Sequence, residues 1–171
     1  MRVGQEMKVI GWGVTSNENK SSSRLLQDTE ILVQDPKDCS PLRSSYSSND
    51  LDVVCMANSV NKKDTCYGDS GGPALSKISD NQLKEEGGKV KYNLVGITSY
   101  GDSQQKELDS KGRPICGGNG AIGFYTRVGD YLKFIASNTK LSVDYLVANT
   151  TGTGIPLSNK FDSQQGAKVV N

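Results

Sequence analysis

The chain has 171 residues, with 20 basic and 19 acidic side chains and a net charge of +1. A chain of this length is enough for one domain with a sizeable core. Its balanced charge provides no field that would attract nucleic acid or an anionic membrane, so we expect neither partner. No apolar run approaches the roughly 20 residues that cross a bilayer, and nothing after Met1 resembles a signal peptide.

Glycine is abundant, at 19 residues, whereas 35% of the residues are hydrophobic. This composition is typical of short strands joined by many turns, and it favours an all-β fold.

The predicted elements begin with two strands. Val9–Val14 is a short apolar segment interrupted by glycines, and Leu25–Val33 ends in β-branched residues. Because the polar segment Thr15–Ser23 separates them, we expect a hairpin. Asp35-Pro36 then interrupts the chain, and the Ser-rich segment Lys37–Asn49 is compatible with either a short helix or a loop.

Four more segments have residue types that are typical of strands. They are Leu51–Met56, Pro73–Leu75, Tyr92–Tyr100 and Phe124–Val128. Two charged insertions, Ser76–Lys91 and Asp102–Arg113, are expected to be solvated loops.

The C-terminal part divides into a helix and a tail. Val128, Tyr131, Leu132 and Ile135 repeat at helical spacing, which predicts one amphipathic helix at the end of the domain. We therefore assign residues 1–139 to the domain. Residues 140–171 contain few bulky side chains and much Gly, Ser, Thr and Asn, which predicts a flexible tail.

The cysteines Cys39, Cys55, Cys66 and Cys116 occur in a chain that contains no histidine. Without histidine or a Cys-x-x-Cys pair they make a poor zinc site, so we expect no metal and no cofactor. Two disulfides are favoured, and three pairings are possible. Disulfides indicate an oxidising compartment. Because the chain has no signal peptide of its own, we expect it to be part of a longer protein.

The segment Asp64–Pro73 places Ser70 among glycines, which adopt backbone angles that other residues avoid. Such a turn can present backbone N–H groups. If those of Gly68 and Ser70 converge, they would bind the oxyanion formed when a hydroxyl attacks a peptide carbonyl, contributing about 3 to 4 kcal/mol per donor. A bare Gly-x-Ser-x-Gly string is more often an ordinary Gly-rich turn.

The longer string Gly68-Asp69-Ser70-Gly71-Gly72-Pro73 resembles the nucleophile motif of the chymotrypsin/trypsin family of serine peptidases. Other family motifs follow in the family's order, which are Gly11-Trp12-Gly13, Cys55 with Cys66, Ser99-Tyr100-Gly101, Cys116, and Gly123-Phe124-Tyr125-Thr126-Arg127-Val128. The resemblance covers about residues 8 to 139. It implies an antiparallel six-stranded Greek-key barrel with a C-terminal helix, equivalent to the second barrel of the family's double-barrel fold.

The resemblance also implies a role for each residue of the motif. Ser70 would be the nucleophile, and the amides of Gly68 and Ser70 would form the oxyanion hole. Asp69 would pair with the newly cleaved N-terminal amine during zymogen activation.

Substrate selection is implied by residues around the motif. Asp64 would lie at the bottom of the primary specificity pocket and select Lys or Arg by charge pairing. Alternatively, Asp64 is a solvated charge beside Lys62 and Lys63. Ser99, Tyr100 and Gly101 would form one wall and hold an extended substrate, and Gly123 would keep the opposite wall open.

The family pattern further implies the pairings Cys39–Cys55 and Cys66–Cys116, and a secreted, extracellular protein. It implies protein or peptide substrates with Lys or Arg at the cleavage site.

One departure from the family is decisive for activity, because a serine hydroxyl needs a base and this chain contains no histidine. In the family, the histidine and its aspartate come from a first barrel that the resemblance does not reach. We therefore expect the chain alone to be inactive and to need an N-terminal barrel as partner.

The sequence allows two alternative functions. A non-catalytic binding module with the same fold would have no reason to retain both Ser70 and Asp64. An α/β-hydrolase would share the serine motif but needs alternating helices and a histidine after the serine.

Overall fold

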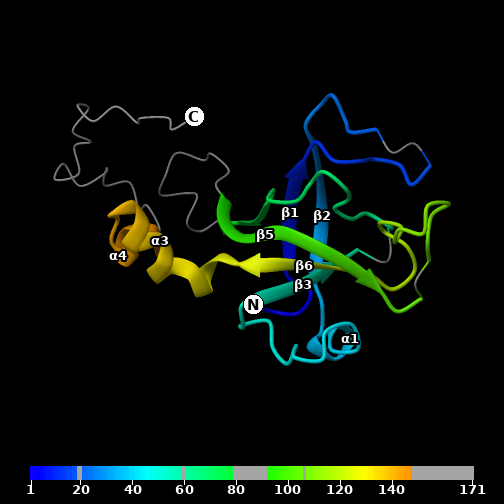
Figure 1. The fold of residues 1–171 in the computed structure, drawn as a ribbon. Helices are drawn as coiled ribbons and strands as arrows, with labels where there is room; N and C mark the ends of the chain where they lie inside the picture. The colour runs from blue at the N-terminus through cyan, green and yellow to red at the C-terminus, as the bar shows by residue number, and fades with distance from the viewer. Residues whose placement is uncertain (19–20, 59–60, 79–91, 106, 148–171) are drawn as a thin grey trace.

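The computed structural model describes residues 1–18, 21–58, 61–78, 92–105 and 107–147. Six antiparallel strands form a closed barrel in the order β1-β2-β3-β6-β5-β4 (Figure 1). The strands are β1 (Glu6–Gly11), β2 (Gln27–Val33), β3 (Val53–Ala57), β4 (Pro73–Lys77), β5 (Tyr92–Ser103) and β6 (Ala121–Arg127). The predicted all-β class, the six-stranded antiparallel barrel and the hairpin of its first two strands are confirmed.

The barrel interior is filled by side chains that alternate along the strands. Met7 and Val9 of β1 point inward, and Ile31 and Val33 of β2 do the same, as expected for strands with one buried face. With Val54, Met56, Ala74 and Tyr125 they form one buried cluster. Closure comes from the pairing of β1 with β4, in which Lys8 lies opposite Leu75.

Strand β3 is buried on both faces, so it does not show the alternation of a half-buried strand. Its outer face belongs to a second cluster, which lies outside the barrel and consists of Cys39, Tyr46, Val53, Cys55, Ala57, Ile122 and Phe124. The short helix α1 (Pro36–Cys39) contributes to this cluster. Its first residue is proline and Asp35 caps it through Lys37 N, which are standard features of a helix start. The segment Lys37–Asn49 therefore begins in a short helix.

Every strand differs from its predicted bounds at one end or both, and the differences in β1 and β5 have long-range reasons. Strand β1 begins at Glu6, where it pairs with Leu32, and it ends at Gly11 instead of continuing to Val14. Strand β5 extends to Ser103, because Ser103 pairs with Ala121 beyond an irregularity between Thr98 and Tyr100. The first two residues of the predicted loop Asp102–Arg113 therefore belong to the sheet.

After β6 the chain forms a 3₁₀ turn, η1 (Val128–Tyr131), and then α3 (Leu132–Thr139), so the predicted terminal helix has a tighter first turn. A further short helix, α4 (Val143–Val147), lies within the predicted tail 140–171. Residues 148–171 lie outside the described part, as does most of the insertion Ser76–Lys91. None of the described helices is long and apolar enough to span a membrane.

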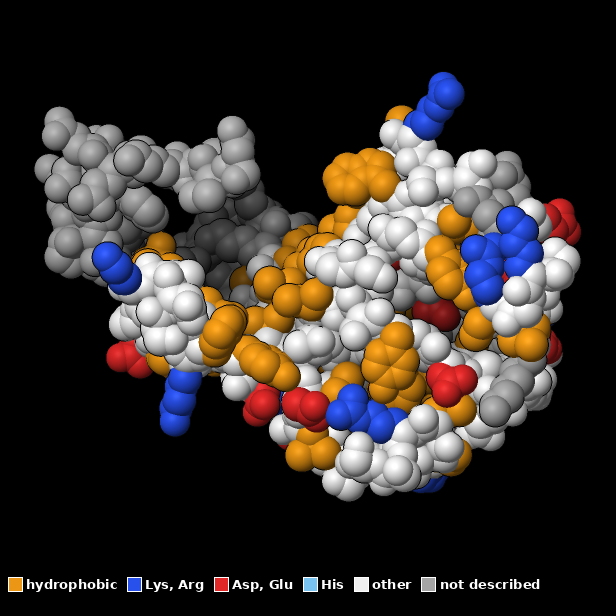
Figure 2. Space-filling model, in the orientation of Figure 1, with side chains coloured by type: hydrophobic (Ala, Val, Ile, Leu, Met, Phe, Trp, Pro, Cys, Tyr) orange, Lys and Arg blue, Asp and Glu red, His pale blue; other side chains and the backbone are white. Residues whose placement is uncertain are grey.

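Helices α3 and α4 lie to one side of the barrel (Figure 1). Several of their hydrophobic side chains are exposed, among them Phe134, of which 66% is accessible. Figure 2 shows hydrophobic side chains on the surface at this end of the molecule.

A buried hydroxyl connects the second cluster to the polar segment after α1. The hydroxyl of Tyr46 accepts a hydrogen bond from Cys55 N at 3.0 Å and donates one to Asn49 Oδ1. The amide of Asn49 donates in turn to the carbonyl of Gln34 at 2.9 Å.

Tyr46→Phe should lower the free energy of unfolding by about 1 to 3 kcal/mol, because it leaves the buried Cys55 N–H without its acceptor. Urea denaturation with the disulfides intact measures this. Tyr145→Phe, at a more exposed tyrosine, is the control and should change stability by less than about 0.5 kcal/mol. Equal stability of Tyr46→Phe and the unmodified chain would contradict the role of this hydroxyl.

Candidate active site

The serine-bearing loop lies between β3 and β4, and its backbone is folded into a tight turn. Asp69 N donates to Cys66 O at 3.0 Å, and Gly72 N donates to Asp69 O at 2.8 Å. Gly68 has φ +99, in the region that favours glycine. Ser70 is exposed on this turn.

The carboxylate of Asp69 holds this loop against the end of β1. Its Oδ1 accepts from Gly13 N at 2.7 Å, and its Oδ2 accepts from Cys66 N at 2.9 Å. A Cβ atom at Gly11 would lie 1.9 Å from Asp69 Oδ1, and one at Gly13 would lie 2.4 Å from Asp69 Cγ. Both glycines of Gly11-Trp12-Gly13 are therefore required by the close approach of this side chain, a contact that the sequence analysis did not foresee.

A pocket of about 320 Å³ opens beside the serine. It is lined by five of the predicted site residues, which are Asp64, Ser70, Ser99, Tyr100 and Gly101. The disulfide-bonded Cys66 and Cys116 also line it. The two disulfides, Cys39–Cys55 and Cys66–Cys116, have the pairing that the family resemblance implied.

Two predicted site residues, Gly68 and Gly123, are not among the described residues that line this pocket. Gly68 belongs to the serine loop. Gly123 is buried in β6, opposite Gly101 of β5. A Cβ atom at Gly123 would lie 2.9 Å from the ring of Tyr125, so its immediate steric constraint is this tyrosine.

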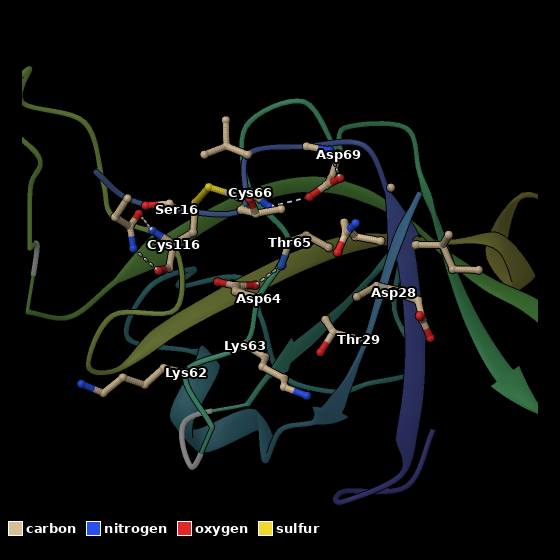
Figure 3. Close-up of a pocket in the computed structure, with 18 residues that line it drawn as sticks. Ser16, Asp28, Thr29, Lys62, Lys63, Asp64, Thr65, Cys66, Asp69 and Cys116 are labelled. Atoms are coloured by element: carbon tan, nitrogen blue, oxygen red, sulfur yellow. Dashed lines mark hydrogen bonds between the residues drawn. A yellow bond between two sulfur atoms is a disulfide. The ribbon is translucent and has the colours of Figure 1, made fainter. Parts of the chain in front are cut away.

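Asp64 is partly buried and accepts two backbone hydrogen bonds, from Thr65 N at 2.8 Å and from Gly117 N at 3.2 Å. Burial raises the pKa of its carboxyl to about 6, the two hydrogen bonds oppose that rise, and the charge of Asp69 adds to it. At neutral pH the group is predominantly ionised. The side chains of Lys62 and Lys63 extend away from it (Figure 3).

The neighbouring Thr65 fixes the position of Asp64 relative to the barrel. Its hydroxyl lies 2.8 Å from the hydroxyl of Tyr125, a fully buried residue of β6. Burial raises the pKa of Tyr125 above its ordinary value, so this hydroxyl stays neutral. The serine loop is thus tied to the barrel core.

A second cavity, of about 420 Å³, shares part of its lining with this pocket, and Figure 3 shows the residues that line it. Asp64, Thr65, Cys66 and Cys116 line both cavities, whereas Asp69 lines this one alone.

The part of the predicted loop Asp102–Arg113 that begins at Glu107 folds into a hairpin beside the pocket, with Leu108 bridged to Pro114. Asp109 Oδ2 accepts from Arg113 Nε at 3.1 Å. The Arg113 guanidinium lies over the ring of Tyr67, 5.0 Å from its centroid, and the Tyr67 hydroxyl donates to Pro114 O at 2.9 Å. Tyr67 is also a lining residue of the pocket, and the sequence analysis did not single it out.

The chain therefore brings together a serine hydroxyl, a carboxylate and an open pocket, but it contains no histidine. Among the residues that the structure describes, no group of three or more His, Cys, Asp or Glu side chains could hold a metal ion.

Comparison with known proteins gives consistent matches. Phenoloxidase-activating factor 3 of Holotrichia diomphalia is 32% identical over 139 residues, which are 81% of this chain and 34% of that protein. CLIP domain-containing serine protease B4 of Anopheles gambiae is 33% identical over 138 residues, which are 79% of this chain and 31% of that protein. The chain thus spans about a third of the length of these curated relatives.

Among solved structures, neuropsin, a serine protease expressed in the limbic system of mouse brain, matches with a TM-score of 0.58 and 25% identity. The match covers 81% of this chain and 49% of neuropsin. The trypsin family model matches residues 1–135. On this match, together with the barrel and the serine motif, the chain belongs to the trypsin family of serine proteases.

Proposed function

We propose that this chain is the nucleophile-bearing half of a serine endopeptidase that cleaves after Lys or Arg. The observation that carries the proposal is the pocket beside Ser70, whose lining includes the carboxylate of Asp64. A partly buried carboxylate in a pocket selects a cationic side chain, because a neutral one would leave the charge desolvated and unpaired.

In the proposed reaction, Ser70 Oγ attacks the backbone carbonyl carbon of the substrate Lys or Arg. The hydroxyl proton passes to a base, and the carbonyl oxygen becomes an oxyanion that accepts from the amides of Gly68 and Ser70. Collapse of the intermediate breaks the peptide bond, and the amine leaves with the proton. Water then hydrolyses the acyl-enzyme by the same route.

The base would come from a first barrel that carries a histidine and its aspartate. This agrees with the share of the relatives that the chain covers, 34% and 31%. The exposed side chains of Phe134 in α3 and of Trp12, of which 57% is accessible, are suited to contact with such a barrel. Asp69 lines the second cavity and would receive the new N-terminal amine there after zymogen cleavage.

Substrate and compartment follow from the same features. Ser99–Gly101 of β5 lines the pocket and would pair with an extended protein or peptide substrate. The two disulfides support an extracellular, secreted protein.

Replacement of the pocket carboxylate tests the specificity. Asp64→Asn should weaken binding of p-aminobenzamidine, a fluorescent monocation, by about 10-fold or more, because hydrogen bonds to charged groups contribute about 1.5 to 3 kcal/mol. A fluorescence titration of the full chain measures this. Asp102→Asn, which removes another carboxylate from the same lining, is the control and should change affinity by less than about threefold. Equal losses in both variants would refute selection by Asp64.

The binding should also depend on pH with the pKa of Asp64. Protonation removes the negative charge, so affinity for p-aminobenzamidine should fall as pH decreases through about 6. An aspartate with its ordinary value would retain affinity to about pH 4. Titrations between about pH 4.5 and pH 8 distinguish the two, and an affinity that is constant over this range would contradict the raised pKa.

Labelling with a fluorophosphonate tests the nucleophile, because this reagent reacts with activated serines. In an extract of the producing organism, Ser70 should be the labelled residue, as identified by peptide mass spectrometry. The 171-residue chain expressed alone should not be labelled, because it contains no histidine. Labelling of the isolated chain would show that a base lies within these residues. An unlabelled Ser70 in an extract that contains the protein would contradict peptidase activity.

A further inference from the structure

The segment that follows β1 contacts the serine loop at successive positions. Gly13 N donates to Asp69, and Val14 N donates to Tyr67 O at 2.9 Å. Three residues further on, the side chain of Asn17 contacts Cys116, which lines the pocket beside Ser70. The segment therefore connects the serine loop with the pocket wall that contains Cys116.

Asn17 pairs with the main chain of Cys116 in both directions. Its Nδ2 donates to Cys116 O at 2.8 Å, and its Oδ1 accepts from Cys116 N at 3.0 Å. The side-chain amide of Asn17 thus pairs with the main chain of Cys116 as a neighbouring β-strand would. The two residues lie 99 positions apart in the sequence. Both bonds have good lengths for neutral hydrogen bonds.

The residue after Cys116 contacts the pocket carboxylate. Gly117 N donates to Asp64 Oδ2 at 3.2 Å, and this bond depends on where the main chain of residues 116 and 117 lies. Gly117 has φ +64, and a Cβ atom there would lie 2.2 Å from Lys62 O, so the two chain segments are closely packed.

Two side chains hold this stretch of main chain by hydrogen bonds. Asn17 bonds to residue 116, and Asp64 bonds to residue 117. The disulfide to Cys66 fixes the side chain of Cys116. The hairpin contacts end one or two residues earlier, at Pro114 and Ile115.

We infer that Asn17 is a positioning residue for the specificity pocket: by holding the main chain of Cys116, it keeps the amide of Gly117 on the carboxylate of Asp64. The inference rests on the proposed function, in which Asp64 receives the cationic side chain of Lys or Arg. Asn17 itself is exposed on the second-cavity side and does not line the 320 Å³ pocket in the described structure.

Two substitutions separate this geometric role from an effect of charge. Asn17→Ala removes both hydrogen bonds and should weaken p-aminobenzamidine binding by about 3- to 10-fold, because one or two neutral hydrogen bonds contribute about 1 kcal/mol each. Asn17→Asp adds a negative charge, which alone would strengthen binding of a cation. It also places a carboxylate oxygen against Cys116 O, so weaker binding than in the unmodified chain is expected. Thr15→Ala, at an exposed neighbouring residue, is the control and should bind normally.

The pH profile provides a readout that general destabilisation would not change. The Gly117 hydrogen bond lowers the pKa of Asp64, so its loss in Asn17→Ala should move the fall in affinity to higher pH. The other charged or titratable groups near Asp64 are the same in Asn17→Ala and in Thr15→Ala. They are Asp69, the Tyr125 hydroxyl, Lys62 and Lys63. An identical profile in both variants, with equal affinities, would overturn the inference.

Amide hydrogen exchange measured by NMR without ligand separates this inference from the proposed function. In Asn17→Ala, but not in Thr15→Ala, the amides of Cys116 and Gly117 should exchange faster. If the unmodified chain fails to bind the probe while these amides still depend on Asn17, the proposed specificity is wrong and the positioning contact stands. If the probe binds and these amides exchange equally in all variants, the positioning role is wrong and the proposed function stands.

Discussion

The carboxylate of Asp69, bonded to the amides of Gly13 and Cys66, is the contact on which the rest of the site depends. It joins the end of β1 to the serine loop and holds that loop in a turn with Ser70 exposed on it. The carboxylate occupies the space that side chains at positions 11 and 13 would need. One partly buried carboxylate therefore accounts for the two glycines after β1 and for the turn on which Ser70 is exposed.

The two hydrophobic clusters explain why this loop can be held rigidly. Strands β3 and β6 contribute to both clusters, one inside the barrel and one beneath α1. Tyr125 belongs to the inner cluster, and its hydroxyl reaches Thr65 beside Asp64. The pocket is thus built on well-packed strands, while its rim is completed by the hairpin that ends at Pro114. The packed strands therefore position the residues around the pocket, and the loops complete its rim.

The sequence was sufficient to predict the barrel, the serine motif and the disulfide pairing, because the family resemblance rests on short strings whose spacing is set within one loop or strand. It was not sufficient for features that depend on residues far apart in the chain. The bond between Asn17 and Cys116 spans 99 positions, and β5 extends to Ser103 only because Ala121 lies opposite. The segment Lys37–Asn49 remained undecided because its helix is stabilised by a capping aspartate and a distant cysteine, not by hydrophobic periodicity. The hairpin of Asp109 and Arg113 resembled a solvated charged loop because its charges pair with each other.

Asp64 lines two cavities, and this has a consequence for solvent. The pocket beside Ser70 and the 420 Å³ cavity also share Thr65, Cys66 and Cys116 as lining residues. A ligand that fills one of the two cavities therefore leaves the other next to the same side chain. The hydration of Asp64 depends on both cavities, and not on the pocket beside Ser70 alone.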